Sequence, residues 1–137
     1  MQRFQAPIAL LARLFLAYIF VMEGWAKITE YAATGDYMEA NGVSAKLLPL
    51  VILTELGGGI LVAAGFMTRY AALALAGFCL LTALLFHSDF SNLEQVINFN
   101  KNIAIAGGFL ALIAFGPGAW SVDERLQRGM RSTSAEA

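Results

Sequence analysis

The sequence predicts an all-α integral membrane protein, a four-helix bundle with both termini in the cytoplasm. First, 58% of its 137 residues are hydrophobic, which is more apolar surface than a soluble chain of one-domain size can bury. Second, there are four apolar runs, and each is close to the ~20 residues that a helix needs to cross a bilayer. Third, arginines and acidic loop residues fall at opposite ends of such a bundle.

We expect a single transmembrane domain over residues 1–121. Its spans are predicted at residues 8–28, 47–67, 70–87 and 98–115. The first run is too long for a secretory signal peptide and lacks a small-residue cleavage site, so it is interpreted as a retained helix. Only Thr68 and Arg69 separate spans two and three, which forces an antiparallel hairpin. Gly116-Pro117-Gly118 ends span four, and residues 122–137 form a short polar cytoplasmic tail.

Two longer connections remain. Residues 29–46 contain Asp36-Tyr37-Met38-Glu39-Ala40, which could form a short interfacial helix, followed by the stop signal Asn41-Gly42. Residues 88–97 are polar and could carry another short helix.

Charge predicts the orientation. All six arginines lie towards one end of the bundle and all three lysines towards the other. The positive-inside rule places the arginine end in the cytoplasm. Arg13 and Arg69 are expected to anchor that side of the protein by reaching lipid phosphates. The net charge of −1, without a basic patch, argues against nucleic acid as a partner.

Glu55 is the residue that most needs an explanation, because it interrupts an apolar span and ionisable groups in hydrocarbon are costly. The predicted topology places a polar group from every span at a similar depth in the outer half of the bundle. Glu55 and His87 are the candidate catalytic residues. The candidate ligand-binding residues are Glu23, Lys27, Lys101 and Asn102. Glu23 and Lys27 can pair at i, i+4, and their stripe, which includes Arg13, should face neighbouring helices.

Two interpretations of this polar layer stay open. Buried charge pairs in membrane bundles can do no more than fix which helices meet. Alternatively, the layer forms a pocket for a polar head group or moves protons, which the histidine favours because it titrates near neutral pH. A metal site is not expected, because one histidine and scattered carboxylates lack ligand spacing. Cys79, the one cysteine, excludes an internal disulfide and is expected to be an inert packing residue.

The ordered motifs resemble those of the DoxX family of small bacterial inner-membrane proteins. They are Arg13, Glu23-Gly24-Trp25-Ala26-Lys27-Ile28, Glu55-x-Gly-Gly-Gly, Gly65-Phe66-x-Thr68-Arg69, Phe86-His87, Lys101-Asn102 and Gly116-Pro117-Gly118. The likeness spans nearly the whole chain. It implies a multi-pass, four-helix protein of the bacterial inner membrane, and roles as a subunit of quinone-linked oxidoreductases or as a partner in thiol redox defence.

Two hypotheses follow. The first is a redox-linked subunit in which Glu55, His87 and Lys101 contact a quinone and exchange its protons, with electrons supplied by a redox partner protein or a second substrate. The second is a non-catalytic subunit, or a binder of small molecules or lipids, whose buried charges are structural. Proton-coupled transport is a third possibility that would need homo-oligomerisation, which small residues at close helix contacts could support.

Overall fold

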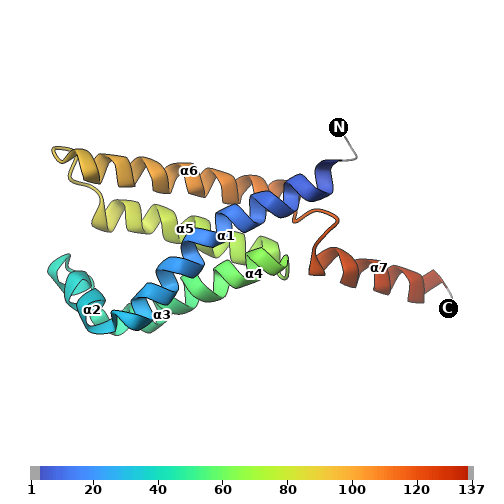
Figure 1. Ribbon diagram of the computed structural model, residues 1–137, viewed down its shortest axis with the longest axis horizontal. Coiled ribbons are helices and arrows are strands. Elements are labelled where there is room, and N and C mark those ends of the chain that lie inside the picture. Colours follow the sequence, from blue (N-terminus) through green and yellow to red (C-terminus); the bar gives the residue numbers. More distant parts are fainter. Residues whose placement is uncertain (1–3, 136–137) are drawn as a thin grey trace.

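The computed structural model describes residues 4–135 and consists of helices joined by short connections (Figure 1). Residues 1–3 and 136–137 lie outside the described residues. They include Arg3, one of the six arginines from which the orientation is predicted. The elements are α1 (Gln5–Thr29), α2 (Tyr31–Ala40), η2 (Ala45–Leu47), α3 (Leu48–Ile52), η3 (Leu53–Gly57), α4 (Gly58–Ala64), α5 (Thr68–Phe86), α6 (Leu93–Phe115) and α7 (Val122–Ala135).

Four helical segments are long and apolar enough to cross a membrane, which confirms the predicted all-α fold with four spans. They are α1, the combined segment Ala45–Ala64, α5 and α6, with 25, 20, 19 and 23 residues. The predicted start of span four at residue 98 was too late. Helix α6 begins at Leu93 because the side chain of Asn92 accepts a hydrogen bond from the backbone N–H of Glu94 and caps the helix. The polar segment 88–97 therefore holds the first turn of α6.

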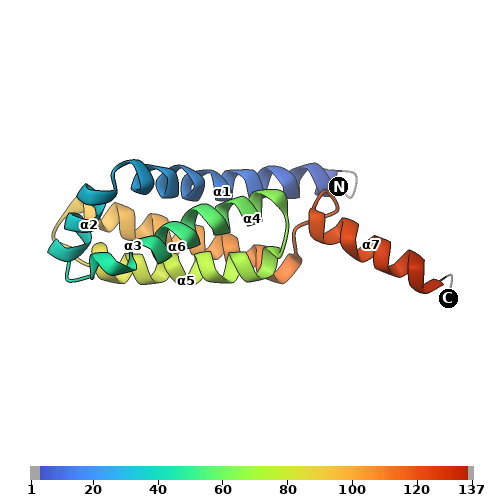
Figure 2. The same ribbon diagram turned by 90° about the horizontal axis from the view of Figure 1, so that it is seen from below.

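The spans pack as two pairs. Helix α5 lies along α6, and α1 lies along η3 and α4, as Figures 1 and 2 show from two directions. The core between the pairs consists mainly of small and aliphatic side chains, and Phe20 of α1 meets Phe109 of α6 with ring centroids 5.4 Å apart. Many large apolar side chains point outward instead, as expected where the surrounding solvent is lipid.

The turn between α4 and α5 is tied to the start of α7. Gly65 and Met67 both have positive φ, at 70° and 47°. The Asp123 carboxylate accepts hydrogen bonds from the backbone N–H of Met67 (2.8 Å) and of Thr68 (2.9 Å), and from the Thr68 hydroxyl (2.8 Å). It thus caps α5 from a distant part of the chain. The segment expected to be a polar tail is helical from Val122 onward and projects beyond the bundle (Figure 2).

Helix α2 lies at the opposite end of the bundle from the termini (Figure 1). It contains the expected short helix at residues 36–40 but is longer, because it begins at Tyr31. Tyr37 stacks on Phe86 at the end of α5, with ring centroids 5.6 Å apart and planes inclined by 18°. This contact joins the connection after α1 to the other helix pair.

Candidate functional site

Glu55 lies in a turn of π-helix, η3, between α3 and α4. A π-helical turn carries one extra residue per hydrogen-bonded ring and frequently occurs at functional sites. Only 5% of Glu55 is exposed. Helix α1 approaches this turn closely: a Cβ on Gly24 would lie 2.7 Å from the backbone nitrogen of Leu56. The absence of a side chain at Gly24 thus lets α1 bring its polar stripe against Glu55.

Lys27 is shared between two carboxylates. Its Nζ lies 2.9 Å from the Oε2 of Glu55 and 3.2 Å from the Oε2 of Glu23. The contact to Glu23 is an aligned hydrogen bond, whereas the contact to Glu55 is close in distance but not aligned as a hydrogen bond. The exposed fraction of the side chain falls from 57% at Glu23 to 20% at Lys27 and 7% at Glu55. The three residues form a charged path from the surface to the interior.

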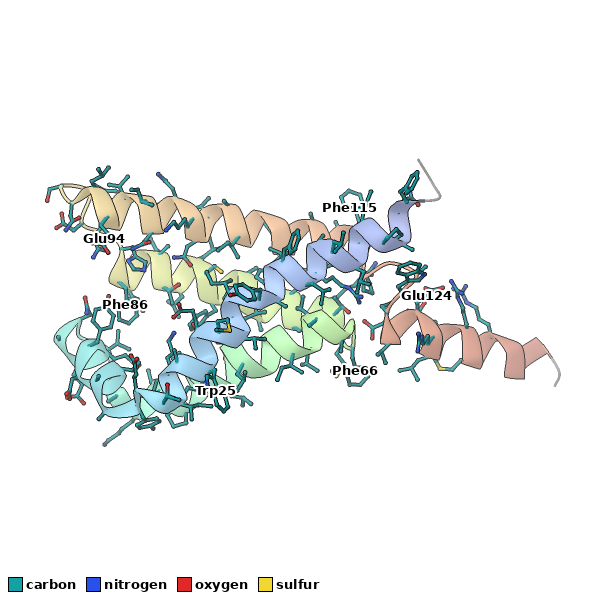
Figure 3. All side chains as sticks on the ribbon, in the orientation of Figure 1. Trp25, Phe66, Phe86, Glu94, Phe115 and Glu124 are labelled. Carbon is teal, nitrogen blue, oxygen red and sulfur yellow. The ribbon has the colours of Figure 1, made fainter. Side chains whose placement is uncertain are left out.

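A cavity of about 780 Å³ adjoins this triad, in the half of the bundle that is remote from the termini. Most of its wall is apolar, and Phe86, which lies between α5 and α2 in Figure 3, forms part of it. Its polar lining comes from every span and from α2: Glu23, Lys27, Thr34, Thr54, Glu55, Thr82, His87, Asn98, Lys101 and Asn102. The structure therefore brings all six predicted catalytic and ligand-binding residues to one cavity.

Polar contacts join α5, and the residue that follows it, to α6. The Nδ1 of His87, which lines the cavity, lies 2.8 Å from the Oε1 of Gln95, which is outside the lining. The hydroxyl of Thr82 is 3.4 Å from the Oδ1 of Asn102, and within α6 Lys101 donates to Asn98 at 3.4 Å. Gln95 and Thr82 were not among the residues predicted from the sequence. The signal for Gln95 was present, because residues 95, 98 and 102 recur at helical spacing and extend the polar stripe of α6 by one turn.

The expectation that Arg13 anchors the protein to lipid phosphates was wrong. Arg13 is 1% exposed, and its Nη2 donates to the carbonyl oxygen of Trp120 at 2.6 Å. The interior position agrees with the predicted direction of the polar stripe on α1. The guanidinium fills the space beside Gly65, where a side chain would collide with it. Arg69, by contrast, is exposed at the end of the bundle that carries the termini.

Metal ligation finds no support in residues 4–135, where no group of three histidine, cysteine, aspartate or glutamate residues could hold an ion. Cys79 is buried in the core between the helix pairs.

Fold and site together define a multi-pass helical membrane protein. Between its helices lies a cavity whose walls are mostly apolar and carry a few charged side chains. The chain belongs to the DoxX family, whose family model matches residues 8–88. It is 52% identical over 119 residues to the "Inner membrane protein YqjF" of Escherichia coli strain K12, an alignment covering 87% of this chain and 92% of that protein. It is also 35% identical over 123 residues to "Inner membrane protein YphA" of the same organism, covering 85% and 88%. No solved structure shows a significant match. The protein is accordingly an inner-membrane protein.

Proposed function

We propose that the cavity binds a lipid-soluble quinone and that the protein is a redox-linked membrane subunit. The observation that supports this proposal is the convergence of Glu55, Lys27, His87, Lys101 and Asn102 on one cavity with mostly apolar walls. Ligand sites of this kind combine apolar surface for the body of the ligand with a few polar groups that orient its head.

The residues present fit a quinone head group. Its two carbonyl oxygens need hydrogen-bond donors, and the Nζ of Lys27 or Lys101 and the amide of Asn102 supply them. When bound, a quinone would supply two-electron redox chemistry, with electrons from a partner protein or a second substrate. The role of this chain is to orient the ring and to hold or pass protons at the Glu55 carboxylate and the His87 imidazole. The Glu23–Lys27–Glu55 triad connects that carboxylate to the surface.

A second candidate function is a non-catalytic subunit in which the charges are structural. The observation that favours it is that Lys27 already lies within ion-pair distance of both carboxylates. Such a cluster can fix the contact of α1 with η3 without any ligand.

Binding of decylubiquinone to the purified protein in detergent, measured by equilibrium dialysis, distinguishes these candidates. We expect saturable binding in the wild type. Lys101→Met and Asn102→Leu should each weaken it about tenfold, because a hydrogen-bond donor to a quinone carbonyl oxygen is lost. Lys46→Met is the matched control, since Lys46 is exposed and lies outside the cavity lining. Binding without saturation, or equal affinity in Lys101→Met and Lys46→Met, would overturn the quinone proposal and leave the structural one.

We also propose that the end carrying both termini faces the cytoplasm. Arg69, Arg125 and Arg128 lie at this end, and the positive-inside rule supports the orientation. A C-terminal fluorescent protein that folds only in the cytoplasm should fluoresce when fused after residue 137. Fluorescence from an insertion after Asn41, but not from the C-terminal fusion, would reverse the orientation.

A further inference from the structure

A second, polar groove lies at the end of the bundle that carries the termini, away from the cavity described above. Its volume is about 470 Å³, and it is formed by the start of α5, the turn after α6 and the first turns of α7. Phe115 and Glu124, which both line it, are labelled at this end of the molecule in Figure 3. Nothing in the proposed quinone site uses these residues.

Positive charge in the groove comes from Arg69. Within residues 4–135, no carboxylate lies at ion-pair distance from its guanidinium. Its Nη2 lies beside Gly116, 3.7 Å from where a Cβ would be. Gly118 and Ala119 also line the groove. A guanidinium with free N–H donors is the side chain best suited to bind phosphate oxygens.

Negative charge lies across the same groove on α7. Asp123 is engaged by Met67 and Thr68, so Glu124 is the carboxylate with the greater freedom. Glu124 contacts Arg128 at 2.9 Å, an exposed i, i+4 pair of the kind that contributes little and exchanges easily. The amide of Gln127 lies in the same lining. One cation and two carboxylates disfavour a purely anionic ligand and suit one that carries both charges.

The groove lies where lipid head groups are expected. Helix α5 begins at Thr68 and α6 ends at Phe115, and the ends of such apolar spans are expected at the edge of the hydrocarbon region. Tyr70, Phe115 and Trp120 are 73%, 89% and 57% exposed around it. Tyrosine and tryptophan at the ends of membrane helices are typical of the interface with the head groups.

We propose that this groove binds the head group of an aminophospholipid, with the phosphate at Arg69 and the ammonium at Glu124 and Gln127. The ligand is a zwitterion whose ammonium can donate hydrogen bonds. The N–H groups of this ammonium distinguish phosphatidylethanolamine from the other two lipids. Phosphatidylglycerol lacks the ammonium, and the quaternary nitrogen of phosphatidylcholine has no N–H. The site is independent of the quinone proposal.

Native mass spectrometry of the delipidated full-length protein tests it. The protein is offered an equimolar mixture of phosphatidylethanolamine, phosphatidylcholine and phosphatidylglycerol with matched acyl chains. We expect preferential retention of phosphatidylethanolamine, and about tenfold less of it in Arg69→Gln, because charge-assisted hydrogen bonds to the phosphate are lost. Glu124→Gln should still bind the phosphate, but its preference for phosphatidylethanolamine over the other two lipids should be smaller than that of the wild type.

Arg125→Gln is the matched control, because Arg125 is exposed on α7 outside the groove lining. Equal retention of the three lipids by the wild type, or a preference for phosphatidylglycerol, would overturn the proposal; the latter would show simple cationic anchoring. Loss in Arg125→Gln equal to that in Arg69→Gln would also overturn it. If Arg69→Gln does not fold, Arg69→Lys and Glu124→Gln still decide the question, since Arg69 is exposed and the Glu124–Arg128 contact lies at the surface.

Discussion

Lys27 of α1 lies 2.9 Å from Glu55 in the π-helical turn of the second span, and so joins two helices through charge. Both side chains are largely withdrawn from the surface, at 20% and 7% exposed. In a buried pair, each charge is tolerable only because of the other. The contact therefore constrains stability as well as any ligand chemistry.

Lys27→Met should be the most destabilising single change in the triad. It leaves the buried Glu55 uncompensated, and loss of one partner of a buried pair costs about 3–5 kcal/mol. Equilibrium unfolding in mixed micelles measures the free energy of unfolding. Adding Glu55→Gln to Lys27→Met should restore much of the loss, because no unpaired carboxylate remains. Glu23→Gln is the control with an expected loss of about 0–1 kcal/mol, since the Glu23 carboxylate is mostly exposed. Equal losses for Lys27→Met and Glu23→Gln would contradict the structural importance of the Lys27–Glu55 pair.

Gly24→Ala should separate α1 from η3. The added Cβ would lie 2.7 Å from the Leu56 backbone nitrogen and 2.8 Å from the Leu56 Cβ, so a helix backbone must move. Such overpacking costs about 1–3 kcal/mol. The matched control is Gly77→Ala on α5, where nothing lies within 4 Å of the new Cβ. There the greater helix propensity of alanine should leave stability unchanged or raise it by up to about 1 kcal/mol. Thermal denaturation of both variants is compared in the same detergent. A Gly24→Ala variant as stable as Gly77→Ala would show that α1 and η3 lie farther apart than in this structure.

The membrane fold and the composition of the cavity could be predicted from the sequence, because spans must be apolar and polar groups at one depth must meet. The π-helical turn at Leu53–Gly57 could not be predicted, since hydrophobic periodicity does not show a one-residue change of backbone register; in the structure this turn contacts α1. Arg13 was misplaced for a related reason. Its acceptor is the carbonyl of Trp120, 107 residues away, and hydrophobic periodicity does not show which distant loop returns to a helix.

Stability at acidic pH should depend on Asp123. Burial raises the pKa of this carboxyl, but the hydrogen bonds from Thr68 and Met67 and the charge of Arg13 outweigh that effect and lower the pKa below its ordinary value. A lowered folded pKa means that the stabilisation is complete above the ordinary aspartate pKa of about 3.9 and is lost as pH falls through the folded value. At pH 7, Asp123→Asn should cost about 1–3 kcal/mol, because one oxygen that accepts from Met67 or Thr68 is replaced by an NH2 group that cannot accept.

The comparison of Asp123→Asn with the wild type is made by unfolding between pH 3 and pH 7. The difference in unfolding free energy should shrink below the ordinary aspartate pKa, because the unfolded wild type then binds a proton that the folded carboxyl resists. Asp36→Asn is the control, since Asp36 is exposed on α2. A difference that stays constant over the whole range would mean that the charge of Asp123 does not contribute.

Gly65→Ala should destabilise the protein more than Gly42→Ala does. Both glycines have positive φ, 70° and 76°. Alanine in this left-handed conformation is therefore strained by a similar amount, about 1–2 kcal/mol, at either position. They differ in surroundings: a Cβ at Gly42 meets nothing within 4 Å, whereas a Cβ at Gly65 collides with the Arg13 guanidinium and lies 2.6 Å from the Ser121 Cβ. The excess loss in Gly65→Ala therefore measures the packing of Arg13 and Ser121 against the turn, and unfolding in detergent gives both values. Equal losses for the two variants would mean that both neighbours can move away at no cost, so that Arg13 is not held in its interior position.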